Sequence, residues 1–266
     1  MNPIEKIVRK ATRHYYTALV AHPQARVWYY NLYQILEGDA EVPNIESAAG
    51  RFDDSWIEQR FERHANDERR HQQLWVDLLE SRNIFNPESI PPWANFVDMV
   101  LNRTWFAARD KLAKQEQVHP SQLIVMFAGM HALEVLGVQR FEIMANLHRT
   151  SDPEIATLLD TIVKDERFHT AYTRESVLRL GRRYGCLDYA ERCLVEAVKA
   201  YQSLGVTMFP RFVDHLRGMG VKFSPWFLLL NQVFKIYGRL TPDLREPPQM
   251  PVQEAKRIPA IAVVSA

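Results

Sequence analysis

The spacing of apolar residues along the chain predicts a protein built from helices. Apolar side chains recur every three or four residues through long stretches, and no stretch sustains the alternation of apolar and polar residues that is typical of a strand. This pattern predicts an all-α fold. We expect helices over approximately these residues: 4–20, 24–42, 55–81, 93–112, 120–148, 153 to 181–185 and 187–203.

Capping residues mark where two of these helices begin. Asp53-Asp54-Ser55 forms a start signal, because such side chains accept hydrogen bonds from the free amides of a first turn. Ser151-Asp152-Pro153-Glu154 is a second start signal, with proline at the first helical position. Pro43 should kink or end the helix that precedes it, and residues 83–92 are expected to form a loop.

Length and composition indicate one large domain with a short tail. A chain of 266 residues that is 47% hydrophobic can bury a sizeable core, and its low glycine content of 10 suits long helices. We expect a helical domain over residues 1–240. Several prolines in a polar run predict an extended or disordered tail over residues 241–266.

Charge and cysteine content argue against several classes of function. The net charge of +1 gives no reason to expect nucleic acid as a partner. Cys186 and Cys193 are too few for a four-cysteine iron site, and we expect them to pack in the core. The first residues lack the apolar region of a signal peptide, which predicts a cytoplasmic protein.

The segment near the C-terminus carries an apolar face at helical spacing. The segment is too short and too polar to span a bilayer. Such a face packs on the other helices, forms a homodimer interface or makes a peripheral contact with a membrane. Its members are Phe223, Trp226, Phe227, Leu230, Phe234 and Tyr237.

A five-residue pattern suited to metal binding occurs twice, as Asp67-Glu68-Arg69-Arg70-His71 and as Asp165-Glu166-Arg167-Phe168-His169. Residues i and i+3 lie on the same face of a helix, so each Glu-x-x-His directs a carboxylate and an imidazole at one point. A glutamate in apolar surroundings precedes the first motif glutamate by 31 residues and the second by 32, namely Glu37 and Glu134. Each distance fits one long helix that returns antiparallel. Four carboxylates and two histidines can therefore converge inside a helical bundle.

A third Glu-x-x-His, Glu116-Gln117-Val118-His119, is interpreted as a chance match. It lies in a polar segment that runs into Pro120, where a helix begins or ends. The metal prediction therefore depends on six residues: Glu37, Glu68, His71, Glu134, Glu166 and His169.

The chemistry of these ligands indicates the kind of metal. Four carboxylates and two imidazoles are harder than the thiolate sites of structural zinc, and they contain more nitrogen than a calcium or magnesium site. Two iron ions fit best, with manganese or a mixed manganese and iron pair as alternatives. Asp67 and Asp165 are expected to accept the ring N–H of a ligand histidine and so to fix its orientation, with solvated or capping acids as the alternative.

Other residues near the motifs allow two interpretations. His64 shares the face of its motif and is interpreted as a core or supporting group rather than a ligand. His131 either packs in the core or faces the site. Trp75 and Tyr172 follow the ligand histidines and are interpreted as aromatic packing, with electron transfer as the alternative. Arg70 is expected to be a surface charge.

These motifs resemble the ferritin-like di-iron carboxylate superfamily, in which two helices give one glutamate each and two give Glu-x-x-His. Segments 36–41 and 163–169 are similar to those of cyanobacterial aldehyde-deformylating oxygenases, and both Asp-Glu-x-x-His segments resemble soluble acyl-carrier-protein desaturases and bacterial multicomponent monooxygenases. The resemblance covers about residues 24–184 and implies a four-helix bundle with additional helices. It implies that Glu37, Glu68 and His71 hold one iron, that Glu134, Glu166 and His169 hold the other, and that Glu68 and Glu166 bridge the two.

The resemblance further implies an oxygen-activating oxidoreductase. We expect hydroxylation, desaturation or deformylation of a small hydrophobic substrate, such as a fatty-acyl or aldehyde compound, with O2 as oxidant and a ferredoxin-like electron donor. Apolar residues near the ligands would line the pocket: Ile35, Leu36, Met126, Phe127, Leu133, Val135 and Phe141.

Four alternatives to this function stay open. They are a ferroxidase, a rubrerythrin-like peroxide-reducing protein, a hydroxylase of transfer RNA and a helical scaffold without catalytic activity. A rubrerythrin-like protein would carry a further glutamate at position 137, where this chain has Gly137. An enzyme that binds transfer RNA would need a clearly basic surface, and the net charge of +1 gives no sign of one.

Overall fold

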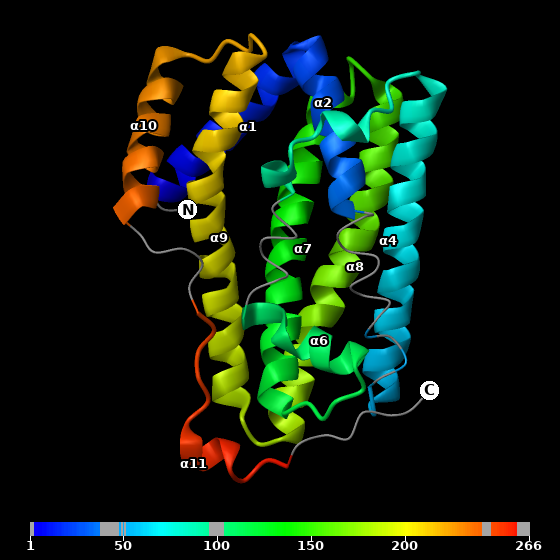
Figure 1. The fold of residues 1–266 in the computed structure, drawn as a ribbon, viewed down its shortest axis with the longest axis vertical. Helices are drawn as coiled ribbons and strands as arrows, with labels where there is room; N and C mark the ends of the chain where they lie inside the picture. Colours follow the sequence, from blue (N-terminus) through cyan, green and yellow to red (C-terminus); the bar gives the residue numbers. More distant parts are fainter. Residues whose placement is uncertain are drawn as a thin grey trace.

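The structure is a computed structural model that describes residues 3–37, 48, 50, 52–95, 104–240 and 246–259. The elements within these ranges are helices, which confirms the all-α fold class (Figure 1). The longer ones are α1 (Pro3–Ala21), α2 (Pro23–Gln34), α4 (Ser55–Ser81), α7 (Pro120–His148), α8 (Pro153–Arg183), α9 (Leu187–Gly218) and α10 (Pro225–Leu240).

The long helices pack side by side with their axes roughly along the length of the molecule (Figure 1). Helix α7 makes its most extensive contacts with α8, and α4 packs against both α2 and α8. Helix α9 covers α7 and α8 on one side, and α10 packs on α9. The centre of the molecule is therefore enclosed by helical faces from distant parts of the sequence.

The predicted start signals are confirmed as helix caps. The Asp54 carboxylate accepts hydrogen bonds from the backbone amides of Trp56 and Ile57 at 3.0 and 3.3 Å, which caps α4. The Asp152 carboxylate accepts from the Ile155 amide at 3.4 Å and caps α8. Arg82, which follows α4, donates to Asp152 at 2.6 Å and thereby ties the end of α4 to the start of α8.

The third Glu-x-x-His has a structural role at its histidine. His119 caps α7, because its Nδ1 accepts a hydrogen bond from the Ser121 amide at 3.2 Å. The residue is not among the metal-ligating groups that the described residues form. This placement agrees with the interpretation of the motif as a chance match.

The predicted continuous helix over residues 93–112 is wrong. A 3-10 turn over Pro92–Ala94 ends at Asn95, a second 3-10 turn spans Thr104–Phe106, and only Ala107–Ala113 forms an α-helix, α6. Residues 96–103 lie outside the described residues. Trp105 is fully buried, and the Phe106 ring contacts the backbone of α7 at Gly129. The apolar residues of this segment therefore enter the core from several short elements and not along the face of one continuous helix.

The predicted end of the next helix, near residue 203, is also wrong, because α9 continues to Gly218. It passes Gly205 and Pro210 without ending. Its last turns bury Val213 and Leu216 completely, so tertiary packing outweighs the weak helix propensity of glycine and proline.

The described part of the C-terminal tail touches the helical domain. Residues 246–250 have no regular secondary structure, and a short helix, α11 (Val252–Ala255), follows. The Tyr189 hydroxyl donates to the Pro248 carbonyl at 3.1 Å, and His119 Nε2 lies 3.2 Å from the Ala255 carbonyl. The other tail residues, 241–245 and 260–266, lie outside the described residues.

Helix α10 packs on the bundle through one face and exposes another. Phe227 is fully buried and packs edge-on against Phe209 of α9. The opposite face exposes Leu229, Val233 and Ile236, at 69%, 52% and 58% of their surface. Packing on other helices therefore accounts for only part of the apolar surface of α10.

Helix α7 is the one helix among the described residues with the length and hydropathy of a membrane span. Its most apolar stretch is mainly buried by the other helices. Since α7 also carries the buried Glu134, its apolar character follows from its central position in the core.

Gly181 should be essential for the packing of α8 on α9. A methyl group at this position would lie 2.7 Å from the Ala190 Cβ and 3.1 Å from the Leu187 Cα, so the helices would have to separate. We expect Gly181→Ala to lower the free energy of unfolding by about 1–3 kcal/mol in chemical denaturation. Gly205→Ala is the control, because no described atom lies within 4 Å of such a methyl. It should stabilise by about 0.5–1 kcal/mol, and equal destabilisation by both variants would contradict this account.

Candidate metal centre

Glu37 lies at the centre of the molecule, where helix α2 changes from α-helical to π-helical geometry. The α-helical part of α2 ends at Gln34 and residues 35–37 form a π-helical turn, while the predicted end of this helix at residue 42 lies outside the described residues. A π turn inserts an extra residue and rotates the following side chains, and such turns are frequent at functional sites. The Glu37 side chain is buried, with its Oε2 3.3 Å from Nδ1 of His71. Residues 38–47 lie outside the described residues.

The two Glu-x-x-His motifs face each other from α4 and α8. All six predicted residues are buried, and both histidines are fully so. Nδ1 of His71 lies 3.6 Å from Glu68 and 3.5 Å from Glu166. Nδ1 of His169 lies 3.2 Å from Glu68, 3.7 Å from Glu166 and 3.9 Å from Glu134. The structure therefore brings the predicted set together.

The six predicted ligands fall into two overlapping groups, and a third group adds His64 to Glu68 and His169. One group combines Glu37, Glu68, His71 and Glu166, and another combines Glu134, Glu166 and His169. Within each group the ligating atoms all lie within 4.8 Å of one another. Glu166 belongs to both groups, and Glu68 contacts both histidines. Both motif glutamates thus occupy positions from which they can bridge two ions.

Several buried polar atoms at this centre have no hydrogen-bond partner among the described residues. Buried polar atoms are normally paired, and leaving one unpaired costs about 1–3 kcal/mol. Here the unpaired oxygens and nitrogens face one another, so a cation is the group that would satisfy them together. They are Glu37 Oε2, Glu68 Oε1 and Oε2, His64 Nε2, His71 Nδ1 and His169 Nδ1.

Electrostatics give the carboxylates different protonation behaviour. Burial raises the pKa of Glu37 to about 8. Burial also disfavours the charge of Glu68, but the charge of His71 and the contacts with the other histidines outweigh it and lower the pKa of Glu68 well below its usual range. Burial opposes the charge of His71 and His169, yet neighbouring carboxylates raise the pKa of both. A metal cation can replace the protons that these histidines would otherwise carry.

Each motif aspartate contacts the histidine of the opposite motif. Asp165 Oδ2 lies 3.3 Å from Nε2 of His71, and Asp67 Oδ2 lies 3.3 Å from Nε2 of His169. With Nε2–H donating to these carboxylates, each Nδ1 is left free to bind a metal. The expected role of the aspartates fits this geometry, but the pairing crosses between α4 and α8.

Arg70 is more than the predicted surface charge. Its side chain is half-exposed, yet one terminal nitrogen donates to Asp67 at 2.8 Å and to Asp165 at 2.6 Å. The guanidinium thereby holds the two aspartates beside each other and offsets their repulsion. Sequence spacing could not reveal this contact, because Asp165 lies 95 residues away.

The remaining candidates occupy different positions around the centre. His131 packs in the core, where its Nδ1 lies 3.1 Å from the Thr170 carbonyl, and it is in none of the ligand groups. Trp75 is buried and stacks on Tyr33, with the ring centroids 6.1 Å apart. His64 is fully buried and lies inside the centre against Glu68, which fits its interpretation as a core or supporting group, and it also belongs to one of the ligand groups.

Comparisons of the chain with family models, with curated proteins and with solved structures find no match. The assignment of this centre therefore depends on its own residues. Carboxylates from the end of α2 and from α4, α7 and α8, together with buried imidazoles, form a donor set suited to first-row transition metal ions.

Removal of either motif glutamate should empty the centre. We expect the purified protein to bind about two divalent transition metal ions per chain, and Glu68→Ala or Glu166→Ala to lose most of them, because each glutamate reaches both ion positions. Elemental analysis after metal loading and desalting measures the content. Glu62→Ala is the control, since Glu62 is exposed on α4. Full metal retention by both core variants would contradict the assignment.

Loss of an aspartate should weaken metal binding without unfolding the protein. We expect Asp67→Ala or Asp165→Ala to reduce metal affinity by about 10- to 100-fold, measured by competition with a chelator. Arg70→Ala should have a smaller effect in the same direction. Arg69→Ala is the matched control, because the Arg69 guanidinium donates to Asn66 on the exposed side of α4. Unchanged affinity in both aspartate variants would show that the aspartates do not support the ligands.

Proposed function

We propose that this protein is an O2-activating non-haem di-iron oxidase or oxygenase, with α2, α4, α7 and α8 as a ferritin-like four-helix bundle. The observation that carries the proposal is the convergence of two buried Glu-x-x-His motifs and two further glutamates on one point. This ligand arrangement is the one that ferritin-like di-iron carboxylate proteins use. Iron is the proposed metal, with manganese or a mixed pair as alternatives.

The proposed iron pair supplies redox chemistry, since two ferrous ions can together deliver electrons to O2. The residues of this chain do the rest. Glu68 and Glu166 hold the two positions at a fixed separation, and Asp67 and Asp165 fix the orientation of the ligand histidines. Burial of the ligands excludes bulk water, which protects a reactive centre from side reactions.

Gly137 leaves space beside one bridging glutamate. It lies one turn after Glu134 on α7, and a methyl group there would be 3.7 Å from Glu166 Oε2 and 3.8 Å from the Phe141 ring. An apolar ring and a ligand oxygen therefore border the same small region, which suits a C–H group that approaches the metals. The absence of a glutamate at this position favours an oxygenase over a rubrerythrin-like peroxide-reducing protein.

Apolar residues near the ligands support a hydrophobic substrate. Leu36, Met126, Phe127 and Phe141 are buried in the core, and the Phe141 ring borders the space beside Glu166. A substrate that reaches the metals between these helices must replace apolar contacts, which favours a fatty-acyl chain or a long-chain aldehyde over an ion. Hydroxylation of a C–H bond consumes one O2, two electrons and two protons and releases one water. We propose a ferredoxin-like protein as the source of the electrons.

Oxygen reactivity with and without lipids tests this function. Iron-loaded full-length protein is reduced anaerobically and mixed with O2, and the absorbance of the oxidised centre is followed with long-chain fatty acids, aldehydes or acyl carriers. We expect one class to accelerate the decay, and mass spectrometry to find a hydroxylated, desaturated or deformylated product. Rapid turnover of excess ferrous iron or peroxide, with indifference to every lipid, would instead support a ferroxidase or peroxidase.

Variants at Gly137 add a control for substrate access. Gly137→Leu should keep two irons and lose the response to the lipid, because its side chain fills the space between Glu166 and Phe141. Gly137→Ala should keep both properties, since its methyl makes only ordinary van der Waals contacts. A full lipid response in Gly137→Leu would mean that the substrate approaches from another side.

A further inference from the structure

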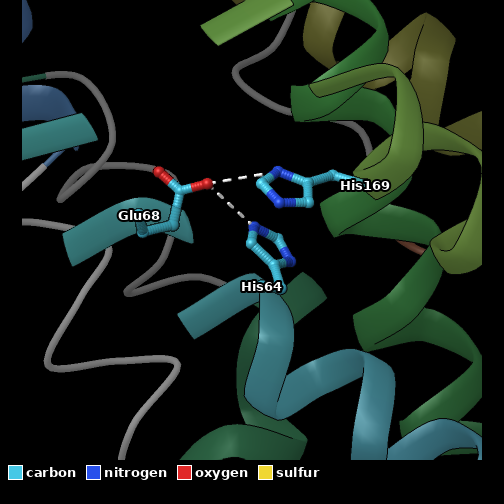
Figure 2. Close-up of side chains that lie close together, drawn as sticks. All are labelled: His64, Glu68 and His169. Carbon is cyan, nitrogen blue, oxygen red and sulfur yellow. Dashed lines mark ion pairs between the residues drawn. The ribbon is translucent and has the colours of Figure 1, made fainter. Parts of the chain in front are cut away.

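His64 lies inside the metal centre, one helical turn before Glu68 on α4. Its side chain is fully buried, and its Nε2 lies 3.1 Å from Glu68 Oε1 and 3.3 Å from Glu134 Oε1. The ring stacks on that of His169 with centroids 3.7 Å apart and an angle of 23°. Figure 2 shows that the His64 and His169 rings both approach the same oxygen of Glu68.

The position of Nε2 is not that of an ordinary hydrogen-bond donor. The distances to the two carboxylates are short, but the atom makes no hydrogen bond of acceptable geometry with any described residue. The same is true of His71 Nδ1 and His169 Nδ1, which belong to the predicted ligands. His64 Nε2, Glu68 and His169 also place ligating atoms within 4.8 Å of one another.

In His64, as in the two predicted ligand histidines, one ring nitrogen contacts a side chain of the facing helix and the other points to the carboxylates. In His64 the nitrogen with the side-chain partner is Nδ1. Nδ1 lies 2.6 Å from the Tyr172 hydroxyl, in a buried contact between α4 and α8. With Nδ1–H donating to the Tyr172 oxygen, the tautomer leaves a lone pair on Nε2, which is the form that binds a metal. In His71 and His169 the roles of the two nitrogens are exchanged: Nε2 contacts Asp165 or Asp67, and Nδ1 is left to bind a metal.

We propose that His64 is a third histidine ligand, which binds through Nε2 the ion on the His169 side of the centre, beside Glu68 and Glu134. This inference rests on the proposed di-iron function, and it adds His64 to the six proposed metal ligands. The two ions become unequal, because one has two nitrogen ligands and the other has only His71.

The sequence pattern supports this asymmetry. On α4 the motif reads His-x-x-x-Glu-x-x-His, with the first histidine four residues before the glutamate. The equivalent position on α8 is Ile162, which is fully buried. The two halves of the centre therefore match in Asp, Glu and His but differ at the position four residues before the glutamate.

Stepwise metal binding to variants of the full-length chain tests the proposal. Ferrous iron is titrated anaerobically into the wild type, His64→Ala and His64→Asn, with circular dichroism to check that each variant is folded. We expect both variants to keep one ion of wild-type affinity and to bind the second about 10- to 100-fold more weakly, or more weakly still. The X-ray absorption spectrum at the iron edge should show fewer imidazole ligands per iron than in the wild type.

Two matched variants distinguish the loss of a metal ligand from the loss of a neighbouring buried side chain. His131→Ala removes a buried histidine that contacts Thr170 rather than the carboxylates, and it should leave both affinities unchanged. Tyr172→Phe removes the partner of His64 Nδ1, and it should weaken the second ion by less than His64→Ala does.

The outcomes distinguish this inference from the proposed function. A wild type that fails to bind two ions would overturn both. A wild type with two ions and folded His64 variants of unchanged affinity and unchanged imidazole content would overturn the third ligand alone. Weaker binding with an unchanged imidazole count would also overturn it, because His64 would then act through a hydrogen bond to Glu68 or Glu134.

Discussion

The burial of four carboxylates at one point is the constraint on which the rest of this structure depends. Glu37, Glu68, Glu134 and Glu166 are each less than a tenth exposed. A buried carboxylate without a counter-charge costs several kcal/mol, on the order of the stability of a whole domain when four are combined. Imidazoles offset part of this cost, and bound cations can offset the rest. The core is therefore built for a charged ligand rather than for maximal stability.

This constraint explains why α4 and α8 are joined across the centre by polar contacts. Asp67 and Asp165 each orient the histidine of the opposite helix, and Arg70 holds the two aspartates together. A shift of one helix along the other would break both aspartate contacts and would separate Glu68 from Glu166. The orientation of the histidines therefore depends on the register between α4 and α8. Arg70, although half-exposed, supports the buried site through its contacts with both aspartates.

The asymmetry of the centre arises from two local features. A π-helical turn, rather than a regular helix, delivers Glu37 to one ion position. His64 stands beside the other position, where the equivalent residue of α8 is Ile162. If His64 binds as proposed, the two ions differ in nitrogen content, and a difference in affinity and reduction potential follows from the ligands themselves.

The sequence by itself determined the helices and the six central residues, because helical periodicity, caps such as Asp54 and Asp152, and i, i+3 spacing are local properties. It did not determine where packing overrides local preference: α9 runs through Pro210, and residues 104–113 fold as a 3-10 turn followed by the short helix α6. Only the tertiary structure decided the crossed aspartate pairs, the contacts of Arg70 and the place of His64. Each of these depends on which faces of α4 and α8 meet, and residues about a hundred positions apart carry no local signal of that contact.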